Sequence, residues 1–221
     1  ERVIEQRPHY GFAAFAPPVR LQDLSPDEIR RRKRTFNALT IILRMAFRLA
    51  WDSGHIQSER PWRCIHRVPV VHAPRLTFLT RDECTRLITE CTPALAILVQ
   101  AALYTGCRVG ELARLRVEDV GHQMFGIHVR PFKRSPARFV FLPDEGMAFF
   151  LGCCDGKAPR DRILASDMDK TWRRQHARLF RRAVERAGLP REFVFHGLRH
   201  TYASDLVRQG VPMEVVARQL G

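Results

Sequence analysis

The chain has 221 residues, and its 37 Lys and Arg residues outnumber its 23 Asp and Glu residues, giving a formal net charge of +14 at pH 7. This excess favours a polyanionic partner, most often a nucleic acid, and the 45% apolar content is enough for one or two domains with hydrophobic cores. The six cysteines show no C-x-x-C spacing, which argues against a disulfide framework and a zinc ribbon. The sequence has no long apolar run and no signal-peptide pattern, which argues against a membrane span and against secretion. We therefore expect a cytoplasmic protein.

The first third of the chain predicts one long helix followed by a linker. Ser25, Pro26 and Glu28 have the spacing of a capping box with proline in the first helical turn. Apolar residues then recur at helical spacing until Gly54, which can end the helix. Residues 61–76 contain three prolines and are predicted to be an extended linker.

The remaining residues predict several helices around a β-hairpin. Capping signals, helical periodicity and two alternating segments indicate where these elements begin and end. The expected elements are a helix from Thr80, a helix from Thr92 to near Gly106, strands at 126–130 and 138–143, and helices at about 168–187, from His196 to Gly210 and after Pro212. The fold class expected is therefore mainly α with a small antiparallel β-sheet.

Two basic residues stand in predicted turns, and each has an ordinary and a functional interpretation. Arg108, in TGCRVGELARLR, precedes a short helix that carries Glu111, and the same pattern fits a surface arginine between two helices. Lys133 lies in the hairpin beside Arg134, and a basic hairpin is usually just an exposed turn. However, only four of the 37 basic residues are lysines, and lysine can release a proton near neutrality whereas arginine cannot. Lys133 is therefore a candidate for proton transfer.

His196 and Arg199 share one face of a predicted helix in FHGLRHTYASDLVRQG, because they are three residues apart. The same two residues fit the polar N-terminus of an ordinary helix. His200 follows His196 by four residues, a spacing also found in zinc sites. The zincin pattern needs a glutamate directly after the first histidine, but Gly197 stands there, so no metal site is predicted.

Three separated segments together resemble, in order and spacing, the catalytic domain of tyrosine recombinases of the phage-integrase family. They are TGCRVGELARL, the Lys133 hairpin followed by RFVFLP, and HGLRHTYASDLVRQGVPMEVVARQLG. The helix at 26–54 with GHIQSERPW resembles the end of the family's helical core-binding domain. We therefore expect part of a core-binding domain, a DNA clamp, in residues 1–72 and a catalytic domain, incomplete at its C-terminus, in residues 73–221.

The resemblance implies a site-specific recombinase or integrase that cuts and rejoins duplex DNA through a 3′-phosphotyrosine, without metal, ATP or any other cofactor. Arg108 and Arg199 would hold the scissile phosphate, and Lys133 would protonate the departing 5′-oxygen. His196 would assist at the phosphate or as an acid/base, and Glu111 would orient the site by pairing with a nearby cation. A homotetramer on DNA is implied, with no membrane partner. The residues expected to contact DNA are Arg108, Lys133, Arg134 and Arg199.

The nucleophilic tyrosine of the family follows the segment that matches Leu220 and Gly221, and Tyr10, Tyr104 and Tyr202 do not match its position. Residues 1–221 alone are therefore expected to bind DNA with little or no cleavage. Two alternatives stay open. One is a DNA-binding protein of the same fold that does not cleave, and the other is a type IB topoisomerase, which the pattern HGLRHTYAS disfavours.

Overall fold

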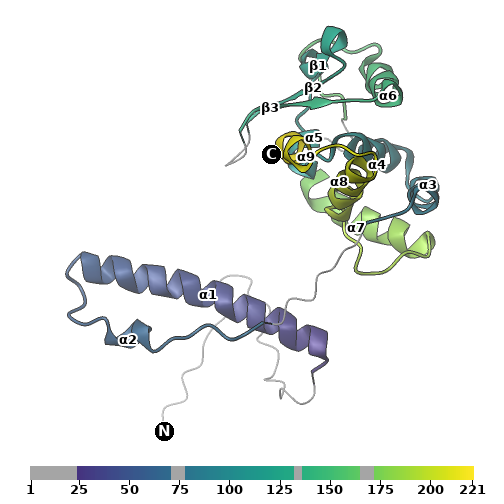
Figure 1. The fold of residues 1–221 in the computed structure, drawn as a ribbon. Helices are drawn as coiled ribbons and strands as arrows, with labels where there is room; N and C mark the ends of the chain where they lie inside the picture. The colour runs from purple at the N-terminus through teal and green to yellow at the C-terminus, as the bar shows by residue number, and fades with distance from the viewer. Residues whose placement is uncertain (1–23, 71–77, 132–135, 165–171) are drawn as a thin grey trace, which may run out of the picture. The chain divides into compact units, whose positions relative to one another are not determined.

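A computed structural model describes residues 24–70, 78–131, 136–164 and 172–221 (Figure 1). The chain forms two compact units, residues 1–74 and residues 75–221. The assignment of the first as a core-binding region and of the second as a catalytic domain stays a prediction at this point. Within the described ranges, no helix is both long and apolar enough to cross a lipid bilayer.

The first unit contains the long helix α1 (Pro26–Asp52) and the short helix α2 (Arg60–Arg63). The predicted capping box is confirmed, because the Glu28 N–H donates to Ser25 Oγ and the Ser25 N–H donates to the Glu28 carboxylate. The expected extended linker is wrong at its start, where α2 forms and Trp62 stacks on Phe47 with ring centroids 5.8 Å apart. Residues 71–76 of that linker lie outside the described residues.

The second unit is mainly α with one small sheet, as predicted. Its helices are α3 (Arg81–Thr89), α4 (Pro93–Thr105), α5 (Val109–Leu112), α6 (Asp144–Cys154), α7 (Trp172–Arg186), α8 (Gly197–Arg208) and α9 (Met213–Leu220), with 3₁₀ turns η2 (Val117–Asp119) and η3 (His122–Met124). The strands are β1 (Val120–Gly121), β2 (Gly126–Val129) and β3 (Arg138–Phe141). Neither α6 nor β1 was predicted from the sequence.

The three strands form an antiparallel sheet in the order β1-β2-β3. The predicted pairing of the two longer strands is confirmed, with Gly126 opposite Phe141 and Val129 opposite Arg138. Lys133 and Arg134, the predicted functional residues of this hairpin, lie outside the described residues.

Helix α4 lies at the centre of the second unit (Figure 1) and packs against α8. It is apolar on nearly every side, which is typical of a helix surrounded by protein. Its buried residues are Leu95, Leu98, Val99, Ala101, Ala102 and Thr105. Because α4 and α8 are joined through this core, the C-terminal end of α4 and the N-terminal end of α8 are held in fixed positions.

Candidate active site

Helix α4 ends in a tight turn that carries Arg108. Gly106 adopts a left-handed conformation with φ of 61°, which glycine adopts at little cost, and its N–H donates to the Ala102 carbonyl at 2.9 Å. A Cβ atom at this position would lie 2.4 Å from Tyr202 Cδ1 and 2.8 Å from Leu220 Cδ2. The turn therefore needs a residue without a side chain, and it places Arg108 directly before α5.

Helix α8 brings His196 and Arg199 to the same turn. His196 immediately precedes the helix, and Arg199 lies in its first turn. Arg199 Nη1 donates to the Gly106 carbonyl at 3.0 Å, which ties α8 to the end of α4. Two segments about ninety residues apart in the sequence are thus joined by a hydrogen bond to a backbone carbonyl.

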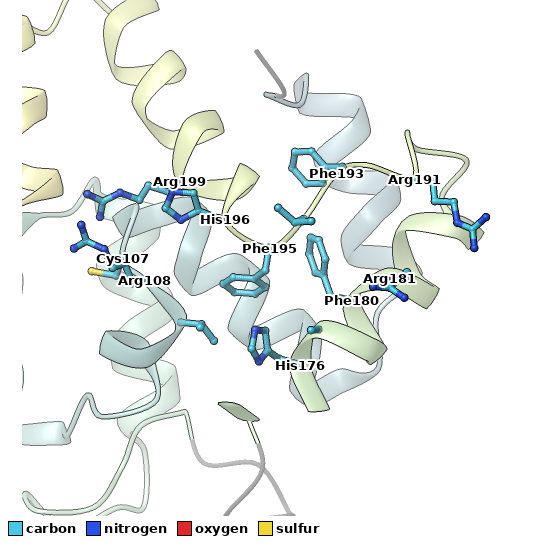
Figure 2. Close-up of a pocket in the computed structure, with 13 residues that line it drawn as sticks. Cys107, Arg108, His176, Phe180, Arg181, Arg191, Phe193, Phe195, His196 and Arg199 are labelled. Atoms are coloured by element: carbon cyan, nitrogen blue, oxygen red, sulfur yellow. The ribbon is translucent and has the colours of Figure 1, made fainter. Parts of the chain in front are cut away.

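The two arginines converge on one oxygen atom. The backbone oxygen of Gly221, the last residue of the sequence, accepts hydrogen bonds from Arg108 Nη2 at 3.3 Å and from Arg199 Nη2 at 3.1 Å. Figure 2 shows both side chains beside His196. The structure therefore brings Arg108, His196 and Arg199 together, whereas Lys133 and Arg134 lie outside the described residues. We call Arg108 and Arg199 the arginine clamp.

Glu111 lies behind the clamp and is almost fully buried, with 4% of the residue exposed. Its carboxylate accepts the Arg108 backbone N–H at 2.9 Å and Arg108 Nη1 at 3.2 Å. Arg138, the first residue of β3, donates two further hydrogen bonds to it, at 2.7 and 3.1 Å. Burial by itself would raise the pKa of the Glu111 carboxyl, but these hydrogen bonds and the two guanidinium charges hold the pKa below its usual value. Glu111 is therefore an anion that binds two cations.

The site holds more positive than negative charge. Arg108, Arg138 and Arg199 lie near one another, and Glu111 is the carboxylate bonded to two of them. Within the described part of the chain, Arg199 forms no ion pair with an Asp or Glu side chain. Burial lowers the pKa of Arg199, and repulsion from Arg108 and Arg138 lowers it further. An anion bound between the arginines would relieve that repulsion.

A cavity of about 370 Å³ opens beside the clamp. Arg108, His196 and Arg199 line one end, and Arg181 and Arg191 line the other (Figure 2). Three aromatic side chains lie between the two basic ends, namely Phe180, Phe193 and Phe195. The cavity therefore combines cationic ends with an apolar middle.

We expect the pKa of His196 to rise when an anion fills the clamp. Partial burial, His200 and the two arginines hold this pKa below its usual value. A bound anion offsets the arginine charges and favours the imidazolium. Without a bound anion, the pKa of His196 is lower in the folded protein than in the unfolded chain. At pH values between these two pKa values, the unfolded chain therefore binds more protons than the folded protein. The contribution of His196 to folding stability thus increases as the pH rises through this range.

The measurement is a pH titration of the His196 ring signals by NMR, with and without millimolar sulfate, which does not titrate in this range. The Arg199→Gln variant is the control, because it should lose most of the sulfate-induced increase. A His196 pKa that ignores sulfate in the unmodified protein would show that the imidazole does not sense the clamp.

Other candidate chemistries find less support in the described residues. His196 and His200 lie with ring centroids 5.1 Å apart, but no group of three His, Cys, Asp or Glu side chains in the described ranges is placed to hold a metal ion. Cys107 lines the cavity, but burial raises the pKa of its thiol to about 11, so the thiol is neutral at physiological pH. We therefore consider the arginine clamp the functional feature of this site.

Neither described tyrosine has the environment of a nucleophile. Tyr202 is 6% exposed, as expected for a core aromatic, and its hydroxyl donates to Gln219 Oε1 at 2.8 Å. Burial raises the pKa of the Tyr202 hydroxyl. Tyr104 packs against Phe149, with ring centroids 5.5 Å apart. Tyr10 lies outside the described residues.

Sequence reasoning missed Arg138. Its only signal is that an arginine opens the apolar strand RFVFLP, and nothing in that pattern reveals that the side chain is buried. The contact with Glu111 joins residues 27 positions apart and depends on the tertiary fold.

Comparison with known proteins shows the family to which the chain belongs. The sequence profile of the phage integrase family matches residues 77–221. The chain belongs to this family. An integrase of Salmonella phage P22 is 30% identical over 189 residues, which cover 74% of this chain and 46% of the relative. A tyrosine recombinase of Thermosipho africanus (strain TCF52B) is 29% identical over 194 residues, covering 86% of this chain and 68% of the relative. The chain thus spans about half the length of the phage P22 integrase.

Solved structures of integrases share the fold. A lambda integrase tetramer bound to a Holliday junction superimposes with a TM-score of 0.67 at 21% identity, covering 93% of this chain and 66% of that one. The Tn1549 transposon integrase in complex with circular intermediate DNA gives a TM-score of 0.68 at 17% identity, covering 92% of this chain and 77% of that one. The expected tyrosine-recombinase fold class is therefore confirmed.

Proposed function

We propose that the full-length protein is a site-specific DNA recombinase or integrase that cuts and rejoins duplex DNA through a 3′-phosphotyrosine intermediate, without metal or ATP. The observation that carries this proposal is that Arg108, His196 and Arg199, which come from two separate segments of the chain, line the same cavity. The site around them has an excess of positive charge. Such a clamp suits a phosphodiester, whose negative charge increases in the pentacoordinate transition state.

The proposed reaction divides the chemistry among a few side chains. A tyrosine hydroxyl gives its proton to a base or to water, attacks the phosphorus and forms the 3′-phosphotyrosine bond, while the bond to the 5′-oxygen breaks. Lys133 supplies the proton that this leaving oxygen takes up. Arg108 and Arg199 stabilise the negative charge on the non-bridging oxygens, and His196 assists at the phosphate. Attack by a 5′-hydroxyl reverses these steps and rejoins the strand.

The proposed partner is duplex DNA, bound by several copies of the protein. Its net charge of +14 supports a polyanionic partner. The related lambda integrase binds a Holliday junction as a tetramer, and the Tn1549 integrase binds circular intermediate DNA. We propose a homotetramer on DNA, in which residues 1–72 form part of a DNA clamp and the Lys133–Arg134 hairpin also contacts DNA.

A second candidate function is DNA binding without cleavage. The observation that favours it is the burial of Tyr202 together with its hydrogen bond to Gln219, which leaves that hydroxyl unsuited to attack a phosphate. A protein that kept the arginine clamp but lacked a reactive tyrosine would still hold a DNA phosphate.

A suicide substrate distinguishes these two functions. The protein expressed from the complete reading frame is incubated with nicked duplex DNA that carries its recombination site and cannot be religated. The recombinase proposal predicts a covalent protein–DNA adduct, attached through tyrosine and formed equally well in EDTA. Binding without any adduct supports the second function, and loss of the adduct on chelation would contradict the metal-free mechanism.

We further expect residues 1–221 to bind duplex DNA with a strong dependence on salt. If Lys and Arg side chains neutralise DNA phosphates, the logarithm of the affinity falls with the logarithm of salt concentration by about 0.9 per phosphate contacted. Fluorescence anisotropy at several salt concentrations measures the slope. An affinity that does not change with salt would contradict phosphate-dominated binding.

A further inference from the structure

Arg138 is a buried cation that connects three segments of the second unit. Only 6% of its side chain is exposed. It donates through Nη1 and Nη2 to Glu111, through Nε to the Gln219 carbonyl at 2.8 Å, and from Nη2 to Cys107 Sγ at 3.5 Å. All three guanidinium nitrogens are therefore used.

The contact with Glu111 extends to the clamp. Glu111 accepts hydrogen bonds from both the backbone and the side chain of Arg108. Because a carboxylate can accept several donors at once, its position depends on both arginines. Without Arg138, Glu111 would lose two of its four hydrogen bonds and could turn fully toward Arg108, away from the geometry in which Arg108 reaches the shared oxygen.

The contact with Gln219 extends to the C-terminal helix. Gln219 lies in α9 and also accepts a hydrogen bond from Tyr202 of α8 through its side chain. A Cβ atom at Gly221 would lie 2.9 Å from Arg138 Cδ, so the backbone that leaves α9 runs against the arginine stem. Arg138 thus contacts the segment that ends at Gly221, whose backbone oxygen accepts hydrogen bonds from both clamp arginines.

We propose that Arg138 is a positioning residue that holds Arg108, through Glu111, and the end of α9, through the Gln219 carbonyl, in one fixed arrangement. Only the forked guanidinium reaches both partners at once, whereas a lysine retains the charge but not the geometry. This proposal rests on the proposed function for its effect on catalysis. It goes beyond the expected roles of the clamp residues, because Arg138 is not itself among the residues that line the cavity and reaches it only through Cys107.

The test compares Arg138→Lys with the control Arg130→Lys in the full-length protein. Arg130 also forms two short ion pairs, with Asp119 at 2.7 Å and Glu118 at 2.6 Å, but it is not part of the described cavity lining. At saturating DNA, we expect Arg138→Lys to reduce the cleavage rate about 10²-fold, the effect of a misplaced catalytic group. DNA affinity should change little, and Arg130→Lys should cleave at the unmodified rate.

Normal cleavage by Arg138→Lys would overturn the proposal, because charge alone would then be sufficient. The proposal would also be overturned if both variants lost cleavage activity equally and in proportion to the folded protein that each loses in thermal unfolding. The loss of cleavage would then result from lower stability. A second readout does not depend on cleavage. Inorganic phosphate is titrated while the His196 ring signals are followed by NMR, and Arg138→Lys should bind phosphate more weakly than Arg130→Lys.

The two readouts separate this proposal from the proposed function. If the unmodified protein forms no covalent adduct, the recombinase function fails, but weaker phosphate binding by Arg138→Lys still supports positioning of the clamp. If the adduct forms and phosphate binding is the same in both variants, the positioning role is overturned while the recombinase function stands.

Discussion

Lys133→Arg in the full-length protein is expected to retain DNA binding and lose most cleavage. Arginine keeps the positive charge that attracts the DNA backbone. It does not readily deliver a proton to the leaving 5′-oxygen, because its pKa lies above about 12. General-acid catalysis typically contributes about 10²–10⁴-fold, so the single-turnover cleavage rate should fall within that range.

A substrate with sulfur in place of the 5′-bridging oxygen provides the control. Its leaving thiolate needs no proton, so Lys133→Arg should recover much of its rate on this DNA. Normal cleavage of ordinary DNA by the variant would show that Lys133 is a basic turn residue without a role in proton transfer. Equal impairment on both substrates would instead assign it a role in positioning the DNA.

Gly106→Ala is expected to cause the largest loss of stability among simple changes at the site. A left-handed conformation costs a non-glycine residue about 1–2 kcal/mol. The added methyl group would also press on the Tyr202 ring and on Leu220, and overpacking of this kind costs about 1–3 kcal/mol. Together these terms predict a loss of about 2–5 kcal/mol in the free energy of unfolding, measured by denaturant titration.

Gly152→Ala is the matched control. Gly152 lies in α6, and a Cβ atom there would meet nothing within 4 Å. Alanine should stabilise that helix by about 0.5–1 kcal/mol. Because the Gly106 carbonyl accepts Arg199, the Gly106→Ala variant should also bind sulfate more weakly at a temperature where it stays folded. Unchanged stability in Gly106→Ala would show that the turn relaxes without cost.

Local rules were enough to predict most elements of the fold. The capping boxes before α1 and α3 formed as predicted, because a Ser or Thr and a Glu three residues later satisfy each other's backbone donors without help from the rest of the chain. Gly106 ended α4 for an equally local reason. The expected extended linker was wrong where Trp62 packs on Phe47, because tertiary packing there outweighed local preference.

In the site, too, some features follow from the local sequence and others depend on tertiary packing. The sequence by itself determined the residue types, their order and the turn that presents Arg108, because these depend on short-range spacing. Only the tertiary structure decided that Arg108 and Arg199 reach one oxygen atom and that a buried Arg138 lies behind them. Those contacts join β3, α5, α8 and α9, of which α5 and α8 pack on the buried helix α4 and α9 packs on α8 and β3. Burial is a property of the packed chain that the pattern of neighbouring residues does not contain.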